Sequence, residues 1–369
     1  MKNSFGNTVT VTVFGESHGP FIGATLDGLS PGVKVDEEYI SNIMLQRAPF
    51  GTISTQRHES DKAEIISGVF NGYTEGTPIT VIIKNENTVS KDYSYLKLIP
   101  RPGHADYTAE VKYNGYQDYR GGGHFSGRTT CGIAALGAIC RTALLSKGIK
   151  IGTHISEIHG IEDKCFCDFE SDIDAVNGKQ FAVLDDSIGE KMQEEINFAR
   201  RNSDSVGGVL ETAIIGLEAG VGEPWFDSIE SMLSHALFAI PGVKGVSFGD
   251  GFSLASMYGS EANDSLFYEN EKVKFRTNSN GGINGGISNG MPITIKTAVK
   301  PTPSISKEQD SVNLETKKNA ILTVSGRHDP CIVHRVRSVV DALCAITLCD
   351  FLETKHGINY FCEDRYERS

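Results

Sequence analysis

The sequence has few of the features that mark metal sites, secretion or membrane insertion. Its 369 residues include eight cysteines, but no C-x-x-C pair and no paired zinc spacing. Cys165 and Cys167, near His159, are the one alternative for a metal, and we favour reduced thiols in a cytosolic protein. The N-terminus lacks a basic segment followed by an apolar run, and no apolar stretch approaches the ~18 residues that span a bilayer. These absences predict a soluble cytoplasmic protein without a resident metal.

Basic charge is also scarce, since 35 Lys and Arg residues face 47 Asp and Glu residues and leave a net charge of −12. This balance argues against a general nucleic-acid or membrane-surface binder. An anionic ligand must therefore be attracted by a local group of arginines. Glycine, in contrast, is abundant at 40 residues, and glycine permits tight turns and close approach of the backbone to a ligand.

The periodicity of apolar residues predicts a mixed α+β protein. We expect strands at 9–14, 63–69, 78–84, 210–218 and 292–299, and helices at 36–45, 129–147, 190–201, 228–240 and 336–355. The segments "GVFNGYTEGTPIT" (68–80) and "GISNGMPIT" (286–294) share Asn-Gly followed by Pro-Ile-Thr, which suggests two related halves. No Pro/Ser-rich linker or charge block separates the halves, so we expect one domain over residues 1–369, built as a layered α+β sandwich.

Four of the ten histidines lie in glycine-rich, turn-like segments: His18, His104, His124 and His328. Histidine exchanges protons near neutral pH, and loops at strand ends are where sites are usually built. One such histidine is most simply structural, but four together indicate a site. Eight arginines fall in or beside the same segments, namely Arg47, Arg57, Arg101, Arg120, Arg128, Arg327, Arg335 and Arg337. Because the guanidinium fork matches two oxygens, this set favours a substrate with more than one anionic group over solvated surface charge.

The segment "GGGHFSGRTT" (121–130) is one residue away from a nucleotide-binding P-loop, with Arg128 in the place of lysine. The preceding "VKYNGYQDYR" is too polar for the buried strand that a P-loop requires. The loop still opens the predicted helix at 129–147, so its amides suit a single anion. "VKPTPSI" (299–305) offers a lysine and hydroxyls for another phosphate, and "GGINGGISNG" (281–290) offers bare backbone to a planar ring, although either segment could be an ordinary turn.

Taken together, these segments resemble the chorismate synthase family. Three blocks stand in the family's order: "GESHGPFIGATLDG" near the start, "GGGHFSGRTT" in the middle and "GRHDPCIVHR" near the end. "RPGHADYT", "GGISNG" and "KPTPSI" match as well, so the resemblance covers nearly the whole chain.

The resemblance implies conversion of 5-enolpyruvylshikimate 3-phosphate to chorismate with loss of phosphate, a step of aromatic amino-acid biosynthesis. It implies reduced FMN as cofactor without net redox change, a β-α-β sandwich of two similar halves, and a homotetramer. It leaves open whether NADPH or a separate flavin reductase reduces the FMN. The absence of a G-x-G-x-x-G after a strand leans toward a separate reductase.

The resemblance also assigns residues. His18 would protonate the departing phosphate, His104 would keep the reduced flavin neutral, and Asp329 would relay a proton from the flavin. Ser17 and Ser126 would support these groups by hydrogen bonds. The positions matching the FMN site are His124, Phe125, Ser126, Pro241, Gly242, Gly285, Lys300, Pro301, Thr302, Pro303, Ser304 and Arg327. The substrate's carboxylates and phosphate would be bound by Arg47, Arg128 and Arg337, and by Arg57 and Arg335.

Three positions depart from the family pattern. Pro241-Gly242 stands where relatives often carry Asn-Ala, Thr52 stands near a frequent second arginine, and His334 stands where proline is frequent. Two other classes compete with the lyase: a P-loop kinase or ATPase, and a non-catalytic flavin-binding module. Tight FMN binding strengthened by the phosphorylated substrate would separate the three.

Overall fold

The protein is a mixed α+β structure whose main chain forms two five-stranded antiparallel sheets. The computed structural model describes residues 2–55, 61–86, 95–324 and 328–362. The first sheet has the order β1 (Ser4–Phe5), β2 (Thr10–Gly15), β3 (Phe21–Asp27), β7 (Ile79–Lys84) and β4 (Ala63–Ser67). The second has the order β11 (Val243–Phe248), β16 (Ile293–Val299), β10 (Gly208–Ile215), β8 (Lys150–Ile158) and β9 (Ile161–Glu162). The predicted α+β class agrees with this arrangement of helices and antiparallel sheets.

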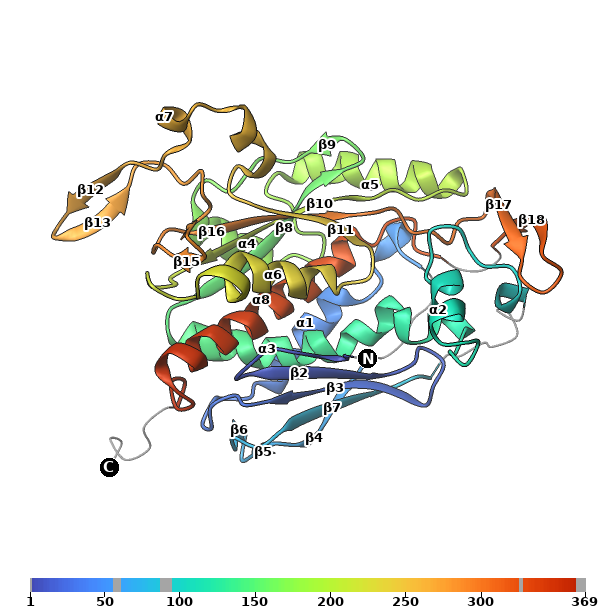
Figure 1. Cartoon of the computed structure of the whole chain (residues 1–369), viewed down its shortest axis with the longest axis horizontal. Helices are drawn as coiled ribbons and strands as arrows, with labels where there is room; N and C mark the ends of the chain where they lie inside the picture. Colours follow the sequence, from blue (N-terminus) through green and yellow to red (C-terminus); the bar gives the residue numbers. More distant parts are fainter. Residues whose placement is uncertain (1, 56–60, 87–94, 325–327, 363–369) are drawn as a thin grey trace.

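Two long helices lie between the sheets: α3 (Thr130–Ser146) and α8 (Val333–His356) (Figure 1). They pack against each other, and α3 contacts the first sheet through β3 while α8 contacts the second through β8. Two shorter helices, α1 (Glu37–Arg47) and α6 (Ile229–Phe238), pack beside them. Two further helices, α4 (Phe169–Asn177) and α5 (Asp186–Arg201), contact β8 of the second sheet.

Helix α3 is apolar on nearly every side, as expected for a helix enclosed by protein. By length and composition, residues 127–146 could cross a membrane, which corrects the expectation that no apolar stretch reaches that length. However, 83% of that apolar window is buried inside the protein. The apolar character of α3 is therefore explained by its position in the core.

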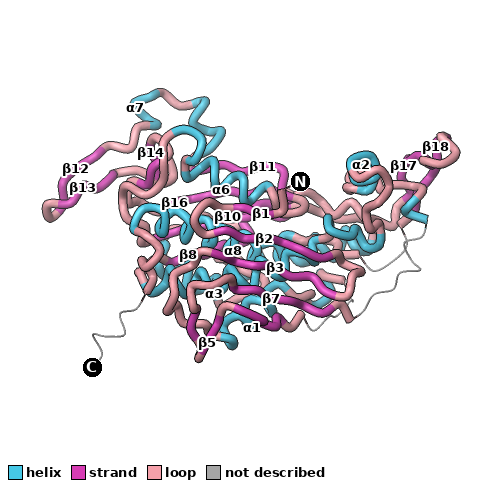
Figure 2. Tube along the Cα trace, turned by 60° about the horizontal axis from the view of Figure 1, so that its bottom comes forward, coloured by secondary structure: helices cyan, strands magenta, loops and turns pink. Residues whose placement is uncertain are grey.

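Short hairpins extend from both ends of the molecule. At one end lie β12 (Leu266–Glu269) with β13 (Lys272–Phe275) and the short helix α7 (Gly259–Ala262); at the other lie β17 (Glu308–Asn313) with β18 (Lys318–Thr323) and α2 (Asp106–Lys112) (Figures 1 and 2). Figure 2 also shows β2, β3 and β7 side by side on one face. Two smaller hairpins, β5 (Val69–Phe70) with β6 (Tyr73–Thr74) and β14 (Ile283–Asn284) with β15 (Ile287–Ser288), precede β7 and β16.

The two sheets repeat one arrangement of strands. The spatial order β2-β3-β7-β4 in the first sheet corresponds to β8-β10-β16-β11 in the second, and each set is followed in sequence by a long helix. The two small hairpins make equivalent contacts. The Thr74 hydroxyl accepts a hydrogen bond from the Val33 amide at 3.0 Å, and the Ser288 hydroxyl accepts one from the Val221 amide at 2.9 Å.

The C-terminal part of α8 holds the start of the chain. The Asp350 carboxylate accepts hydrogen bonds from the amides of Asn7, Thr8 and Val9 at 2.6–2.9 Å. One turn further on, the Glu353 carboxylate accepts the amide of Ser30 at 2.9 Å, and the Ser30 hydroxyl also donates to it. The last helix thus supplies acceptors to backbone groups beside β2 and β3.

Candidate active site

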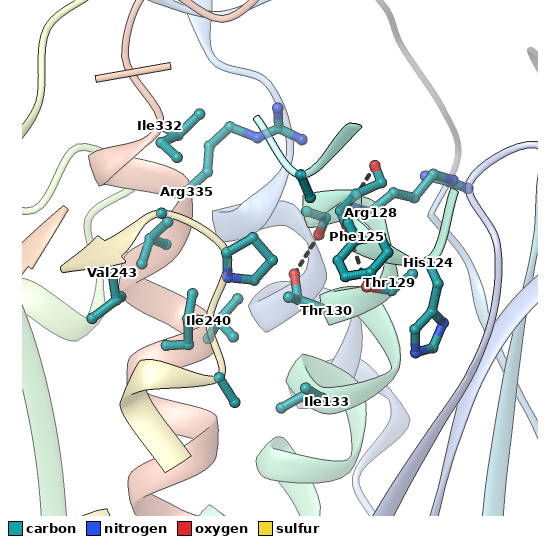
Figure 3. Close-up of a pocket in the computed structure, with 18 of the residues that line it drawn as sticks. His124, Phe125, Arg128, Thr129, Thr130, Ile133, Ile240, Val243, Ile332 and Arg335 are labelled. Atoms are coloured by element: carbon teal, nitrogen blue, oxygen red, sulfur yellow. Dashed lines mark hydrogen bonds between the residues drawn. The ribbon is translucent and has the colours of Figure 1, made fainter. Parts of the chain in front are cut away.

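A cavity of about 840 Å³ opens where the two halves of the chain meet. Its walls come from the N-terminal end of α3, the C-terminal end of α6, the loop after β16 and the first turns of α8 (Figure 3). Ile133, Ile240, Val243 and Ile332 contribute apolar side chains to it, and His124, Arg128, Thr130 and Arg335 contribute polar ones (Figure 3). Cavities of this size with an apolar wall and a few convergent polar groups are typical of small-molecule sites.

The glycine run at 121–123 brings two of the predicted histidines together. All three glycines have positive φ, at 57°, 84° and 53°, and residues with a side chain rarely adopt such values. A Cβ on Gly121 would lie 2.3 Å from the His18 ring, and a Cβ on Gly122 would lie 3.2 Å from the His104 ring. Gly121 and His104 line the cavity, whereas His18 lies behind Gly121 and is 7% exposed. Glycine is required here because both imidazoles pack directly on the backbone.

His104 is oriented by an acidic partner. Its Nδ1 lies 2.7 Å from Asp106 Oδ1, and the same carboxylate binds Arg101 through Nε and Nη2, each at 2.8 Å. Burial raises the pKa of Asp106, but the hydrogen bonds from Arg101 and His104 outweigh it and hold this pKa far below its usual value. The ionised Asp106 accepts the proton on Nδ1, so Nε2 is the ring nitrogen that remains for proton exchange with a ligand.

His18 is oriented by a hydroxyl. The Ser17 Oγ donates to the Gly121 carbonyl at 3.1 Å and lies 2.9 Å from His18 Nδ1. Because Ser17 uses its proton on Gly121, it accepts from Nδ1–H and fixes the tautomer and orientation of the ring. Ser17 therefore supports His18, as the resemblance implies. Ser126 has a different contact, because its Oγ accepts from the Arg128 amide at 3.3 Å.

Asp329 lines the cavity and is held from two sides. Its Oδ1 accepts the Thr55 amide at 2.9 Å, and its Oδ2 binds Arg335 Nη1 at 2.7 Å. The same Arg335 donates through Nε to the Arg47 carbonyl at 3.0 Å. The carboxylate is thus fixed between the end of α1 and the first turn of α8.

Two further arginines meet at the opposite wall. Arg47 and Arg128 both bind the Asp61 carboxylate, with N–O distances of 3.4 and 2.5 Å. Beside Asp61, burial raises the pKa of the Cys131 thiol to about 11, which keeps it neutral at pH 7. The loop after β16 completes the cavity with Lys300, Pro301, Thr302, Pro303 and Ser304, and Pro241 and Gly242 close it from the end of α6.

Two predicted site residues lie away from the cavity in the folded protein. Gly285 is at the turn of the β14–β15 hairpin and does not line the cavity. This hairpin precedes β16, whereas Lys300 follows it, and seven strand residues extend roughly 20 Å. Arg337 is fully buried in the core and donates to the Gln46 side chain at 2.8 Å and to the Lys179 carbonyl at 2.9 Å. Arg57 and Arg327 lie outside the described residues.

Other cavity residues were not assigned from the sequence. Asp61 and Thr55 line the cavity, and Asp106 holds His104 from behind, whereas Arg101, which also lines the cavity, was one of the eight arginines noted in the sequence. Asp106 could have been found, because it follows His104 by two residues in "RPGHAD". Asp61 had no such signal, since no recognised motif includes it. Among the described residues, no group of three or more His, Cys, Asp or Glu side chains is placed to hold a metal ion.

The segment at 121–130 differs from a P-loop in its backbone. It forms two short 3₁₀ turns, Arg120–Phe125 and Gly127–Thr129, and the chain before it contains helix α2 and turns. No strand leads into it among the described residues 95–119. The arrangement lacks the strand–loop–helix unit that a nucleotide-binding P-loop needs.

Comparison with known proteins decides between the remaining alternatives. A family model described as chorismate synthase matches residues 9–352. The chain belongs to the chorismate synthase family. It is 44% identical to chorismate synthases from Thermococcus gammatolerans, over 94% of this chain and 96% of that protein, and from Methanocaldococcus jannaschii, over 98% and 99%. A crystal structure of a chorismate synthase superimposes with a TM-score of 0.74 at 28% identity, covering 95% of this chain and 94% of that one. Membership of the chorismate synthase family makes the chain a carbon–oxygen lyase of aromatic amino-acid biosynthesis.

Proposed function

We propose that the chain eliminates phosphate from 5-enolpyruvylshikimate 3-phosphate to give chorismate, with reduced FMN bound in the 840 Å³ cavity. The observation that carries this proposal is the gathering of His104, Asp329 and four arginines around the cavity, with His18 directly behind Gly121. These groups come from distant parts of the chain, and the elimination needs proton donors and anion-binding groups at one place.

The cavity suits FMN in shape and chemistry. The side formed by Ile133, Ile240, Val243 and Ile332 can pack against a planar ring system. At the other end, the buried Thr302 Oγ1 has no hydrogen-bond partner among the described residues, beside Ser304 and Lys300. A buried hydroxyl without a partner favours a polar ligand group such as a phosphate. His124 and Phe125 would contact the cofactor from the start of α3.

The substrate's anionic groups would bind beside Arg47 and Arg128. Both guanidiniums are held on the protein, Arg47 by the Gly127 carbonyl at 2.6 Å and Arg128 by the Lys84 carbonyl at 3.0 Å. Guanidiniums fixed in this way lose little entropy on binding an anion. Arg335 would act mainly through Asp329, because its two observed hydrogen bonds go to the protein.

Reduced FMN, when bound, supplies the transient electron that lets the C–O bond to phosphate break without net redox change. His18, with Nδ1 fixed by Ser17, would donate a proton from Nε2 to the departing phosphate. His104, with Nδ1 fixed by Asp106, would use Nε2 to keep the reduced cofactor in its neutral form. Asp329 would carry away the proton that leaves the substrate ring.

An anaerobic assay with photoreduced FMN tests this function. We expect phosphate release and chorismate formation from 5-enolpyruvylshikimate 3-phosphate, and FMN binding that tightens when the substrate is present. A purified protein that neither binds FMN nor releases phosphate would overturn the proposal. The same assay in air with NADPH and FMN distinguishes self-sufficient flavin reduction from dependence on a separate flavin reductase.

We also propose that the chain works as a cytoplasmic homotetramer. Aromatic side chains stand out in solvent on the β12–β13 side and near α6, where Trp225 is 84% exposed, Phe226 89% and Phe252 90%. Exposed apolar groups of this size favour burial against another subunit. Sedimentation velocity checks the tetramer, and a monomer at micromolar concentration would contradict it.

We propose finally that residues 1–369 form one domain made of two related halves in a β-α-β sandwich. The matching strand orders and the equivalent contacts of Thr74 and Ser288 support this. The two segments align without a gap as "GVFNGYTEGTPIT" (68–80) and "GINGGISNGMPIT" (282–294). A single cooperative unfolding transition in urea would be expected, and two separated transitions would contradict the single domain.

A further inference from the structure

Every arginine that lines the cavity within the described residues is paired with an aspartate. Arg101 binds Asp106 and Arg335 binds Asp329. The remaining two, Arg47 and Arg128, share a single carboxylate, that of Asp61. A cavity that would receive a multiply charged anion thus contains a buried anion of its own, placed between two of the arginines that would bind the ligand.

Asp61 is held in an unusual way. Its residue is 5% exposed, and its backbone φ of +43° is in the left-handed region that non-glycine residues rarely adopt. Oδ1 binds Arg128 Nη1 at 2.5 Å, while Oδ2 takes Arg47 Nη1 at 3.4 Å and the Cys131 thiol at 3.8 Å. Backbone strain of this kind persists where the surroundings determine the conformation, and it is concentrated at functional sites.

The rest of each guanidinium is fixed independently. Arg47 donates through Nε to Thr130 at 3.2 Å and through Nη2 to the Gly127 carbonyl. Arg128 donates through Nε to the Asn85 side chain at 2.5 Å and through Nη2 to the Lys84 carbonyl. Asp61 is therefore the one described group that joins the two arginines, and without it two like charges would face each other across the cavity wall.

We propose that Asp61 is a positioning and charge-setting residue. Resting on the proposed function, this inference holds that the Asp61 carboxylate fixes Arg47 and Arg128 in the arrangement that the transition state needs. It also holds that Asp61 lowers the affinity of the free cavity for simple anions. Burial raises the pKa of Asp61, but Arg47 and Arg128 together lower it overall, so the carboxylate is ionised at neutral pH.

The inference separates two quantities that a merely structural residue would change together. Removing the charge of Asp61 adds one positive charge to the cavity, so a simple anion should bind more tightly. The same change releases the two guanidiniums from their common partner, so the step that needs their exact placement should slow. Ground-state anion binding and turnover should therefore move in opposite directions.

Asp61→Asn tests this, because asparagine has nearly the same shape and no charge. By calorimetry with inorganic phosphate as the probe and the flavin-free protein, we expect about 5-fold tighter binding, since one opposing charge is removed. In the anaerobic assay we expect kcat to fall roughly 10- to 100-fold while KM rises no more than about 3-fold. Glu64→Gln is the charge-matched control, because Glu64 pairs with Lys84 on the surface; both quantities should stay at wild-type values.

Asp61→Glu keeps the charge and moves it by one methylene, so it should retain wild-type phosphate affinity and lose turnover. If Asp61→Asn does not fold, this variant decides the question alone. Weaker phosphate binding in Asp61→Asn, no phosphate binding in either protein, or an unchanged kcat would overturn the inference. Failure of the proposed function would be recognised by a different result, because the wild-type protein would then form no chorismate. The calorimetric comparison of phosphate binding would still test the role of Asp61.

Discussion

Arg335 binds Asp329 through a 2.7 Å ion pair and at the same time donates to the Arg47 carbonyl at 3.0 Å. The contact joins the first turn of α8 to the end of α1 and fixes the carboxylate at the cavity wall. An arginine in this position acts on the ligand through its aspartate.

Replacing Asp329 with alanine should remove most turnover without loss of the fold. A positioned acid or base contributes about 10²- to 10⁴-fold to rate, so kcat should fall by that factor. The dissociation constant for FMN, followed by flavin fluorescence, should stay within about 3-fold of wild type because the apolar wall is intact. Asp204→Ala, which removes an exposed carboxylate paired with Lys307, is the control. Near-wild-type turnover in the Asp329 variant would refute its proton-carrying role.

His104→Ala should behave in the same way, with FMN still bound and kcat reduced about 10²-fold or more. The imidazole is partly buried and bonded to Asp106, whereas His159 lies on the surface bonded to Glu195. His159→Ala is therefore the matched control, and its steady-state kinetics should equal those of wild type. Equal rates for the two variants would remove His104 from the mechanism.

Gly121→Ala tests the packing of His18 on the glycine run. The new Cβ would lie 2.3 Å from the His18 ring at a residue with φ +57°, so the imidazole must move. We expect kcat to fall at least about 10-fold, since a displacement of 1 Å at a reacting group costs up to about 100-fold. Gly160→Ala carries the same backbone strain, at φ +82°, with no atom within 4 Å of the new Cβ. It should lower the melting temperature slightly and leave kcat unchanged.

His334 should make folding stability depend on pH. The residue is fully buried with Nε2 bonded to Ser54 at 2.7 Å, and burial lowers its pKa from 6.5 to about 4. Below pH 6.5 His334 is protonated in the unfolded chain but stays neutral in the folded chain. Its contribution to the free energy of unfolding is therefore fully present above pH 6.5 and is lost as the pH falls toward 4. At pH 5 the loss should be about 2 kcal/mol, because each pKa unit is worth about 1.4 kcal/mol.

Urea unfolding of wild type and His334→Gln at pH 7.5 and 5 measures this contribution. Glutamine keeps a polar group near Ser54 but does not titrate, so the stability of the variant should fall less between the two pH values. If both proteins lose the same free energy of unfolding over this range, His334 is not the group responsible.

The sequence predicted the four longest helices, α1, α3, α5 and α8, to within four residues at each end, but it missed strands β3, β8 and β11. The helix expected at 36–45 is α1, capped by Asp36, whose side chain accepts the Tyr39 amide at 2.9 Å; Ser228 caps α6 in the predicted place. Helix α5 begins four residues earlier than predicted, at Asp186, because Asp185 caps it. Strand β8 was not predicted, since five successive residues in it are buried and no alternation marks a strand of that kind.

Two of the predicted site residues, Gly285 and Arg337, do not line the cavity, and the reasons are physical. The arginine and glycine patterns indicate which groups suit an anion, but they do not say which end of a strand a residue reaches. Gly285 and Lys300 stand fifteen residues apart in sequence yet at opposite ends of β16. Arg335 and Arg337 are two positions apart on one helix, so they point in different directions, Arg335 to the cavity and Arg337 into the core. Asp61 was missed because its importance comes only from its partners in space.

The contacts of Asp350 and Glu353 have a consequence for how the protein is made. Amides that flank the first strands have their acceptors on a helix more than 300 residues later. During synthesis the N-terminal sheet leaves the ribosome before those carboxylates exist, so these backbone groups lack their acceptors until α8 has been made. The nascent chain therefore carries an N-terminal sheet with unsatisfied backbone groups for most of its synthesis, and this is the period in which chaperone binding would protect it most.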